Sequence, residues 1–349
     1  MKIVFLTRRF WPEVGGVEKH CLEVGKMLIK KGHEVIVISE KPSSKYKQSD
    51  ASSAKVTGEI FGIMIERIDA GIENWFKKFR VWRELWNKKD IIKKADIIHC
   101  HDVFFWYLPF RLIYPHKKVF VTFHGYEGNK IPNDLAVFSH KLAEVLSKGN
   151  ISIGSFYKKW YGTNATIVNY GAIEPKKNVS FKKPGRMRRV LFAGRLEEEA
   201  GIMEYLIALT LLPKTFKYSI DVLGDGSLKR EAIKFCRKNK INAKFYGFVK
   251  NVNKYTQNAD YVFVSRYLGI LETLGLKKPV FAVYNNKIKK DYLTMTPFKK
   301  FISIEKNAEE IAIDLLKEID KEKIEEGYEW AIKQTWEKMA SDYLRLWRV

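Results

Sequence analysis

The sequence contains little cysteine, little proline and no long apolar run. Its three cysteines, Cys21, Cys100 and Cys236, are odd in number and far apart, which predicts neither a disulfide framework nor a zinc site. No stretch approaches the ~20 uninterrupted apolar residues that a membrane-spanning helix requires. Met1 and Lys2 lead directly into a strand-like segment and not into an apolar leader with a small-residue cleavage site, so we expect a cytoplasmic protein.

Acidic residues are scarce beside basic ones. The chain has 40 Asp and Glu residues against 63 Lys and Arg residues, and the formal net charge of +23 favours polyanionic partners such as anionic membranes, nucleic acid or diphosphates. A solvated lysine-rich surface explains the same charge equally well. The lysines are spread along both halves of the chain, so we expect no nucleic-acid partner.

The length and the order of predicted elements indicate two domains. A chain of 349 residues exceeds one ordinary α/β core and fits two domains of roughly 150 to 180 residues. A first series of β-branched runs alternates with helical patterns, and a second series begins after the basic segment 175–189. The predicted strands are 2–6, 33–39, 63–68, 96–101, 119–123, 151–154, 190–193, 219–223, 244–246, 260–264 and 279–283. We therefore predict α/β domains at 1–172 and 173–329, each with a mainly parallel sheet that binds ligands at the carboxyl ends of its strands.

The C-terminal segment carries a periodic apolar stripe. Trp330, Trp336, Met339, Tyr343 and Trp347 recur at helical intervals, which predicts one long amphipathic helix over 325–347. We expect its last part, 330–349, to pack back on the N-terminal domain.

Both halves contain a glycine turn between a strand and a helix. Gly15 and Gly16 precede a helix, and Gly224 and Gly226 follow strand 219–223. Backbone without side chains admits an anion, and the free N–H groups at a helix start attract phosphate, although a tight turn alone would need the same glycines. Arg195 directly follows strand 190–193, where its fork of donors suits a diphosphate unless it forms a structural salt bridge.

Six short motifs occur in an order and spacing typical of one enzyme family. They are Gly15-Gly16-Val17-Glu18, Thr122-Phe123-His124-Gly125, Gly194-Arg195-Leu196, Gly224-Asp225-Gly226, Tyr246-Gly247-Phe248-Val249, and Glu272-Thr273-Leu274 with Pro279-Val280. On these motifs the chain resembles the family 4 retaining glycosyltransferases over both halves. The resemblance implies the GT-B fold, in which two Rossmann-like domains face each other across a cleft.

The resemblance also implies residue roles. Gly15 and Gly16 would line the donor phosphate region, and His124 would lie beside the transferred sugar and the acceptor. Arg195 would stabilise the charge that develops on the donor pyrophosphate as the sugar leaves. The other implied donor contacts are room for the nucleotide at Gly224, Gly226 and Gly247, the base near Phe248, and the ribose hydroxyls at Glu272, which we expect at the start of a helix. Such enzymes need no metal held by an Asp-x-Asp motif, so we expect no metal and no cofactor, only the nucleotide diphosphate sugar as donor substrate.

Two departures from the family pattern remove charge from the implied donor site. Ala200 stands where relatives carry a second phosphate-binding lysine, and Val264 stands where they carry a glutamate. The loop after Val264 is shortened, so we assign Arg266 and Leu268 to the nucleotide-sugar site, with Arg266 as a candidate replacement cation. Alternatively, Arg266 is an exposed loop arginine and activity has been lost.

His99, Cys100, His101 and Asp102 lie together at the end of a predicted strand. His99 and His101 would share one face of that strand, but no third ligand follows at a spacing typical of zinc sites. We therefore assign His101 and Asp102 to the acceptor side and expect no metal there.

The segment 73–89 combines aromatic and basic residues. Trp75, Phe79, Trp82 and Trp86 repeat at spacings of four, three and four, between lysines and arginines. The arrangement that we expect is a helix whose aromatic face packs on the sheet while its lysines are solvated. The alternative is a basic amphipathic helix that lies in an anionic membrane interface.

These observations predict a cytoplasmic glycosyltransferase of hexosyltransferase type, and the membrane alternative for segment 73–89 would make it peripheral at the inner membrane face. It would move a sugar from a nucleotide diphosphate sugar to a hydroxyl of a glycan or lipid-linked acceptor, with retention of configuration. Two alternatives stay open. A catalytically silent sugar- or nucleotide-binding GT-B protein would explain Ala200 and Val264, and a GT-B sugar-nucleotide epimerase would also explain His124.

Overall fold

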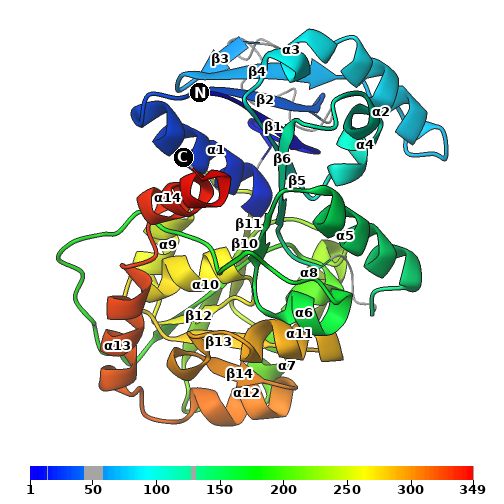
Figure 1. Cartoon of the computed structure of the whole chain (residues 1–349). Coiled ribbons are helices and arrows are strands. Elements are labelled where there is room, and N and C mark those ends of the chain that lie inside the picture. The colour runs from blue at the N-terminus through cyan, green and yellow to red at the C-terminus, as the bar shows by residue number, and fades with distance from the viewer. Residues whose placement is uncertain (14, 43–57, 127–130, 349) are drawn as a thin grey trace. The chain divides into compact units, whose positions relative to one another are not determined.

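The computed structural model describes residues 1–13, 15–42, 58–126 and 131–348, and the chain forms two compact units (Figure 1). The first unit contains Met1–Tyr126, Pro132–Asn169 and Trp336–Val349, and the second is formed mainly by Tyr170–Thr335.

The first unit contains an eight-stranded sheet with the order β3-β4-β2-β1-β5-β6-β7-β8. All neighbouring strands pair in parallel except β3 and β4, which are antiparallel. The central strands are buried on both faces, as their nearly continuous apolar sequences predict. The strands are β1 (Lys2–Thr7), β2 (Glu34–Glu40), β3 (Gly58–Ile60), β4 (Ile63–Ile68), β5 (Ile97–His101), β6 (Lys118–Phe123), β7 (Asn150–Ile153) and β8 (Ile167–Asn169).

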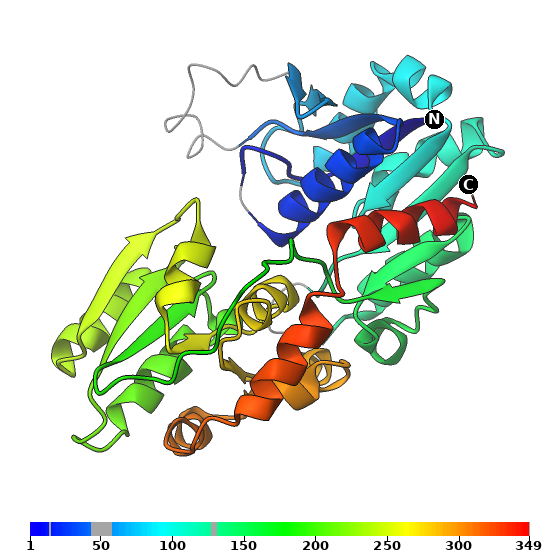
Figure 2. The ribbon, with the colours of Figure 1, turned by 90° about the vertical axis from the view of Figure 1, so that its left-hand side faces the viewer.

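Helices cover both faces of this sheet. Helices α1 and α14 lie side by side on one face, and α2, α4 and α5 lie on the other (Figure 1). The helices are α1 (Gly16–Lys30), α2 (Lys77–Trp86), α3 (Lys89–Lys94), α4 (Phe104–Ile113), α5 (Asp134–Leu146), α6 (Phe156–Tyr161) and α14 (Trp336–Trp347). The C-terminal helix therefore belongs to the first unit, although the residues just before it belong to the second (Figure 2).

The second unit contains a six-stranded parallel sheet with the order β11-β10-β9-β12-β13-β14. Its strands are β9 (Arg188–Ala193), β10 (Tyr218–Leu223), β11 (Ala243–Gly247), β12 (Tyr261–Phe263), β13 (Val280–Val283) and β14 (Ser303–Glu305). Its helices are η2 (Glu198–Ala200), α7 (Ile202–Thr210), α8 (Lys229–Lys238), α9 (Val252–Asn258), α10 (Tyr267–Leu274), α11 (Lys287–Thr294), η3 (Lys299–Phe301), α12 (Ala308–Leu315) and α13 (Lys321–Ala331). Apolar residues of α7, α8 and α12 form one core with the middle strands.

The predicted single C-terminal helix is wrong, because the chain forms α13 and α14 with a break between them. Ile173 pairs with Thr335 in a parallel bridge, and the Ile173 backbone N–H donates to the Gln334 carbonyl at 2.8 Å. This pairing holds the backbone at 334–335 out of the helical conformation. The apolar stripe nevertheless lies where it was expected on α14, since Trp336, Tyr343 and Trp347 are buried.

The expectation for the aromatic stripe of α2 is also wrong. The helix buries Val81 and Leu85, whereas Trp75, Phe79 and Trp86 are 74%, 50% and 45% exposed. Val81 and Leu85 are themselves one helical turn apart, so they form a second, shorter apolar face, and this face packs toward the sheet in place of the aromatic one. Within the described residues, no helix is both long enough and apolar enough to span a bilayer.

Candidate functional site

Two arginines lie at the carboxyl ends of strands in the second unit and contact the same carboxylate. Arg195 follows β9, and its Nη2 lies 2.7 Å from Oε1 of Glu199. Arg266 follows β12, and its Nη2 lies 3.8 Å from the same oxygen. Two guanidinium groups around one carboxylate form a local excess of positive charge, which is the environment that a phosphate or diphosphate needs.

A buried lysine lies against the same turn. The Lys289 side chain is fully buried, and its Nζ donates to the backbone carbonyl oxygen of Glu199. Burial, and after it the neighbouring Arg266 charge, lower the pKa of Lys289 to about 7. Sequence reasoning missed this residue, because Lys289 is one of many lysines and follows no strand directly.

Position 200 brings no charge to this site. Ala200 lies in the short helix η2 and is 7% exposed. Arg266 is close to the Arg195–Glu199 pair, which is the position that a replacement cation would need, and its role as that cation stays a prediction. Glu199, which joins the two arginines, was not identified from the sequence.

The glycines of the second unit have a local structural reason. Gly224 has φ +126°, and a Cβ atom there would lie 1.8 Å from the carbonyl oxygen of Gly194. A Cβ on Gly226 would lie 2.4 Å from the carbonyl oxygen of Leu196. These glycines let the loop after β10 approach the loop after β9, so they position Arg195 whether or not a nucleotide binds nearby.

The remaining predicted donor residues lie after β11 and β12. Gly247 has φ +68°, and a Cβ atom there would meet no described atom within 4 Å. Phe248, which follows β11, is 56% exposed, and Leu268 lies half-buried in the first turn of α10. The prediction that Glu272 lies at the start of a helix is wrong. The helix α10 already begins at Tyr267, so Glu272 lies in its second half.

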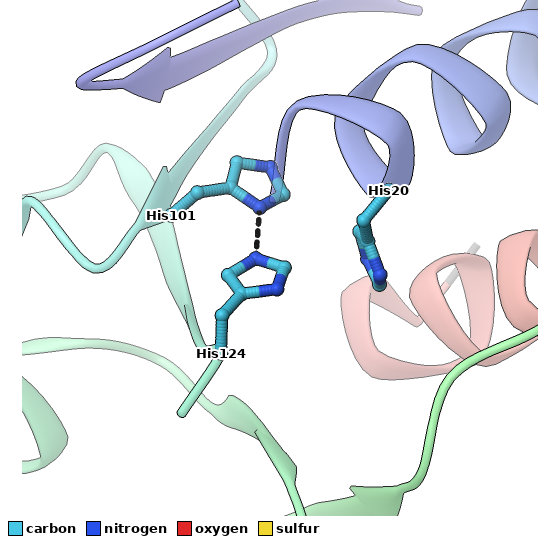
Figure 3. A group of neighbouring side chains, drawn as sticks. All are labelled: His20, His101 and His124. Atoms are coloured by element: carbon cyan, nitrogen blue, oxygen red, sulfur yellow. Dashed lines mark hydrogen bonds between the residues drawn. The ribbon is translucent and has the colours of Figure 1, made fainter. Parts of the chain in front are cut away.

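In the first unit, strand ends bring histidines together. His101 ends β5 and His124 directly follows β6, and Nδ1 of His101 lies 2.8 Å from Nε2 of His124 (Figure 3). Nε2 of His101 is buried and has no hydrogen-bond partner among the described residues. A proton on that nitrogen would be a buried donor without an acceptor, so the favoured arrangement has His101 donating from Nδ1 to His124. Asp102 fixes the loop, because its Oδ1 accepts the backbone N–H of His124 at 2.9 Å.

Helix α1 adds His20, which sequence reasoning missed. Its ring packs edge-on against His124 with centroids 4.6 Å apart, and its Nε2 lies 2.7 Å from the Tyr343 hydroxyl of α14. The Tyr343 hydroxyl is also 2.8 Å from Oγ1 of Thr122 on β6. The C-terminal helix therefore fixes the orientation of His20 beside His124. His20 is a single histidine on a buried helix face, a pattern that does not distinguish a site residue from a core residue.

The histidines at this strand end are neutral. Burial lowers the pKa of His20 to about 3 and lowers the pKa values of His99, His101 and His124 well below the usual range. Neighbouring histidines add to the effect on the last three. With its Nε2 accepting from His101, a neutral His124 keeps its Nδ1–H as a hydrogen-bond donor, which suits a sugar hydroxyl oxygen.

Nitrogens of His20, His101 and His124 lie within 4.8 Å of one another, so these residues could hold a transition metal. A metal bound to Nδ1 of His101 and Nε2 of His124 would replace the hydrogen bond between these two nitrogens. For this reason we retain the metal-free site as a prediction.

Of the two glycines at the start of α1, only Gly16 leaves open backbone. Gly15 is the N-cap of the helix, in an extended conformation and without a side-chain cap. A Cβ on Gly16, the first helical residue, would have no atom of the described residues within 4 Å. A Cβ on Gly15, by contrast, would lie 2.2 Å from Oε2 of Glu18, so the Glu18 carboxylate fills the space beside Gly15. Space for an anion is left beside Gly16 alone, and the phosphate role of both glycines stays a prediction.

Two family models match the chain, one in each half. Residues 14–162 match Glycosyltransferase Family 4, and residues 173–326 match Glycosyl transferases group 1. An uncharacterized glycosyltransferase of Methanocaldococcus jannaschii is 24% identical over 300 residues, which are 76% of this chain and 74% of that protein.

Solved structures of glycosyltransferase fold resemble the whole chain. A glycosyltransferase from Rickettsia africae is 18% identical with a TM-score of 0.70, and the match covers 99% of this chain and 98% of that one. The Anabaena protein HepE, solved with UDP and glucose, is 14% identical with a TM-score of 0.71, and 99% of each chain is covered. With both halves matched by these models and two α/β units of this topology, the chain belongs to the family 4-type glycosyltransferases of GT-B fold.

Proposed function

We propose that this glycosyltransferase uses a nucleotide diphosphate sugar and transfers the sugar, with retention, to a hydroxyl of a glycan or lipid-linked acceptor. One observation carries the proposal. Arg195 and Arg266 meet at one carboxylate at the carboxyl ends of β9 and β12, where a parallel sheet binds its ligands. HepE, which shares the fold, was solved with UDP, and this supports a nucleotide diphosphate as the leaving group.

In this proposal the Glu199 carboxylate pairs with the guanidinium groups of Arg195 and Arg266 until the donor binds. The side chain of Arg195 is 64% exposed, so its pair with Glu199 is worth at most about 1 kcal/mol and a diphosphate can displace it. The guanidinium of Arg195 then stabilises the charge on the departing diphosphate. Arg266 supplies the second positive charge that Ala200 does not.

His124 has the role of a neutral hydrogen-bonding group toward the transferred sugar or the acceptor. Its backbone is fixed by Asp102 and its ring by His101 and His20. His101 and Asp102 therefore act as positioning residues on the acceptor side. Retention rests on the family resemblance.

The test is transfer of labelled sugar from a panel of UDP-, GDP- and ADP-sugars to two acceptor pools, a lipid extract and soluble oligosaccharides. We expect product from one donor class, with the anomeric configuration of the donor when the purified product is analysed by NMR. An inverted product would refute retention, and absence of transfer to both pools would refute the proposed acceptors.

A catalytically silent nucleotide-binding protein is the second candidate, and the buried Ala200 methyl group favours it. Both candidates predict that nucleoside diphosphates bind. Only the enzyme predicts that nucleoside diphosphate is released from a donor sugar, so binding without release would favour the silent protein.

A further inference from the structure

Five aromatic side chains of the first unit project into solvent around α2. Trp75 and Phe76 are 74% and 60% exposed, and Phe79, Trp86 and Phe105 are at least 41% exposed. We call this set the aromatic surface. An exposed group of large rings is unusual unless something covers it, so it indicates an interaction site.

Contacts join Trp75, Phe79 and Phe105 of the aromatic surface through the half-buried Trp82. Trp75 contacts Phe79 with ring centroids 5.5 Å apart, and Phe79 contacts Trp82 at 5.6 Å. The Trp82 indole N–H donates to the carbonyl oxygen of Phe105 at 2.9 Å, which joins α2 to the start of α4. Val81 and Leu85 anchor the helix to the core, so the exposed rings are not needed to hold it.

Uncompensated basic residues flank these rings. Lys78 and Arg83 are exposed, and neither side chain has a hydrogen bond or an ion pair in the part of the chain that the structure describes. Lys89 is exposed and places its Nζ 5.1 Å from the centre of the Trp86 ring. Lys77 and Lys88, by contrast, pair with Glu40 and Glu66 at 2.8 and 2.6 Å.

We propose that the aromatic surface docks on an anionic lipid bilayer, with the rings at the acyl boundary and Lys78, Arg83 and Lys89 among the phosphate headgroups. Exposed tryptophan and phenylalanine beside lysine are the composition of an interfacial membrane helix. A protein partner fits less well, because lysine is depleted in protein interfaces. The net charge of +23 adds attraction to an anionic surface.

Lipid docking goes beyond sugar transfer and does not depend on it, since lipid binding is measured without donor or acceptor. Sedimentation of the full chain with vesicles of phosphatidylcholine containing one-third phosphatidylglycerol provides the measurement. Binding should be strong at low salt, weaken as salt rises, and be weak to vesicles of phosphatidylcholine alone.

The double variant Trp75→Ser/Phe79→Ser tests the rings. It should keep the parent melting temperature. It should bind the anionic vesicles at least about tenfold more weakly, because the variant lacks two rings that the parent buries partly in the lipid. Ile313→Ser/Leu316→Ser at the C-terminal end of α12 is the matched control, since both residues are exposed at 62% and 52% in the second unit, and it should bind as the parent does.

The double variant Lys78→Gln/Arg83→Gln tests the charges independently of the rings. Each basic residue near an anionic surface contributes about fivefold, so we expect about thirtyfold weaker binding at low salt. Arg237→Gln/Lys238→Gln on α8 removes the same net charge from exposed positions in the second unit and should change binding much less.

Several results would overturn the proposal. The first is a parent protein that does not bind anionic vesicles at low salt, and the second is an equal loss of vesicle binding in the test and control variants. The third is unfolding of the Trp75→Ser/Phe79→Ser variant, which would show that these rings stabilise the fold. A concentration-dependent dimer that this variant abolishes, without vesicle binding by the parent, would assign the aromatic surface to a second copy of the chain instead.

Discussion

Replacing Arg195 by alanine should weaken the binding of nucleoside diphosphates far more than the binding of the matching nucleosides. A charge-assisted hydrogen bond contributes about 1.5 to 3 kcal/mol, which corresponds to roughly tenfold to hundredfold in affinity. Because 64% of the Arg195 side chain is exposed, the loss should lie near the lower limit. Nucleosides lack the phosphates and should bind the variant within about twofold of the parent.

Glu199→Gln is the companion variant, and it should act in the opposite direction. It removes the carboxylate that competes with the diphosphate for Arg195 and Arg266. An exposed ion pair is worth about 0.2 to 1 kcal/mol, so diphosphate affinity should rise by up to about fivefold. The Lys289 contact should survive, because it uses the backbone carbonyl of Glu199.

Isothermal titration of UDP, GDP and ADP against uridine, guanosine and adenosine measures these differences. Arg189→Ala is the matched control, because Arg189 lies on β9, the strand that Arg195 follows, and its side chain is 58% exposed, with its Nε 3.9 Å from Asp260. Equal loss of nucleoside and diphosphate binding in Arg195→Ala, or equal losses in Arg195→Ala and Arg189→Ala, would refute the phosphate assignment.

Three further predictions concern the ribose, a turn and the histidines. Glu272→Gln should narrow the preference for ribonucleotides over 2′-deoxynucleotides in competitive binding, and an unchanged preference would argue against a ribose contact. Gly224→Ala should lower the free energy of unfolding, measured by urea titration, by roughly 2 to 5 kcal/mol, because Gly224 has φ +126° and its Cβ would lie 1.8 Å from the Gly194 carbonyl oxygen. Gly16→Ala is the control, because a Cβ there meets no described atom within 4 Å, and it should change the free energy of unfolding by less than about 1 kcal/mol. Burial lowers the pKa of His20 to about 3, so the folded protein resists protonation of His20 whereas the unfolded chain accepts the proton near pH ~6.5. The contribution of His20 to the free energy of unfolding should therefore be complete above pH ~6.5. Below that pH it should fall by about 1.4 kcal/mol per pH unit, down to about pH 3. The slope should be steeper because of His99, His101 and His124, and the His20→Gln variant should have a shallower one. An equal free energy of unfolding of the parent at pH 7 and pH 5 would contradict the assignment of neutral histidines.

The sequence predicts the two sheets well because their strands are runs of β-branched residues bounded by turns. It misses β3, β8 and β14, each of which has three residues and too little periodicity to be recognised. It also misses the break between α13 and α14, because that break depends on Ile173, which is distant in sequence.

Candidate site residues are predictable where they follow strands and hidden where they do not. Arg195, Arg266 and His124 were found from strand ends and motifs, whereas Glu199, Lys289 and His20 come together through tertiary packing. The aromatic stripe of α2 shows a related limit. Periodicity identifies an apolar face, but which face packs on the sheet depends on the competing pair Val81 and Leu85.

Cleavage of a nucleotide diphosphate sugar at a site that includes Arg195 is the proposed activity from which the other assignments follow. Release of nucleoside diphosphate from the donor panel, measured in parallel for the parent and for Arg195→Ala at equal concentrations of folded protein, tests it without intermediate assumptions. We predict release by the parent from one donor class and a loss of at least about tenfold in the variant. Release that is unchanged in the variant, or no release from any donor that the parent binds, would contradict this activity.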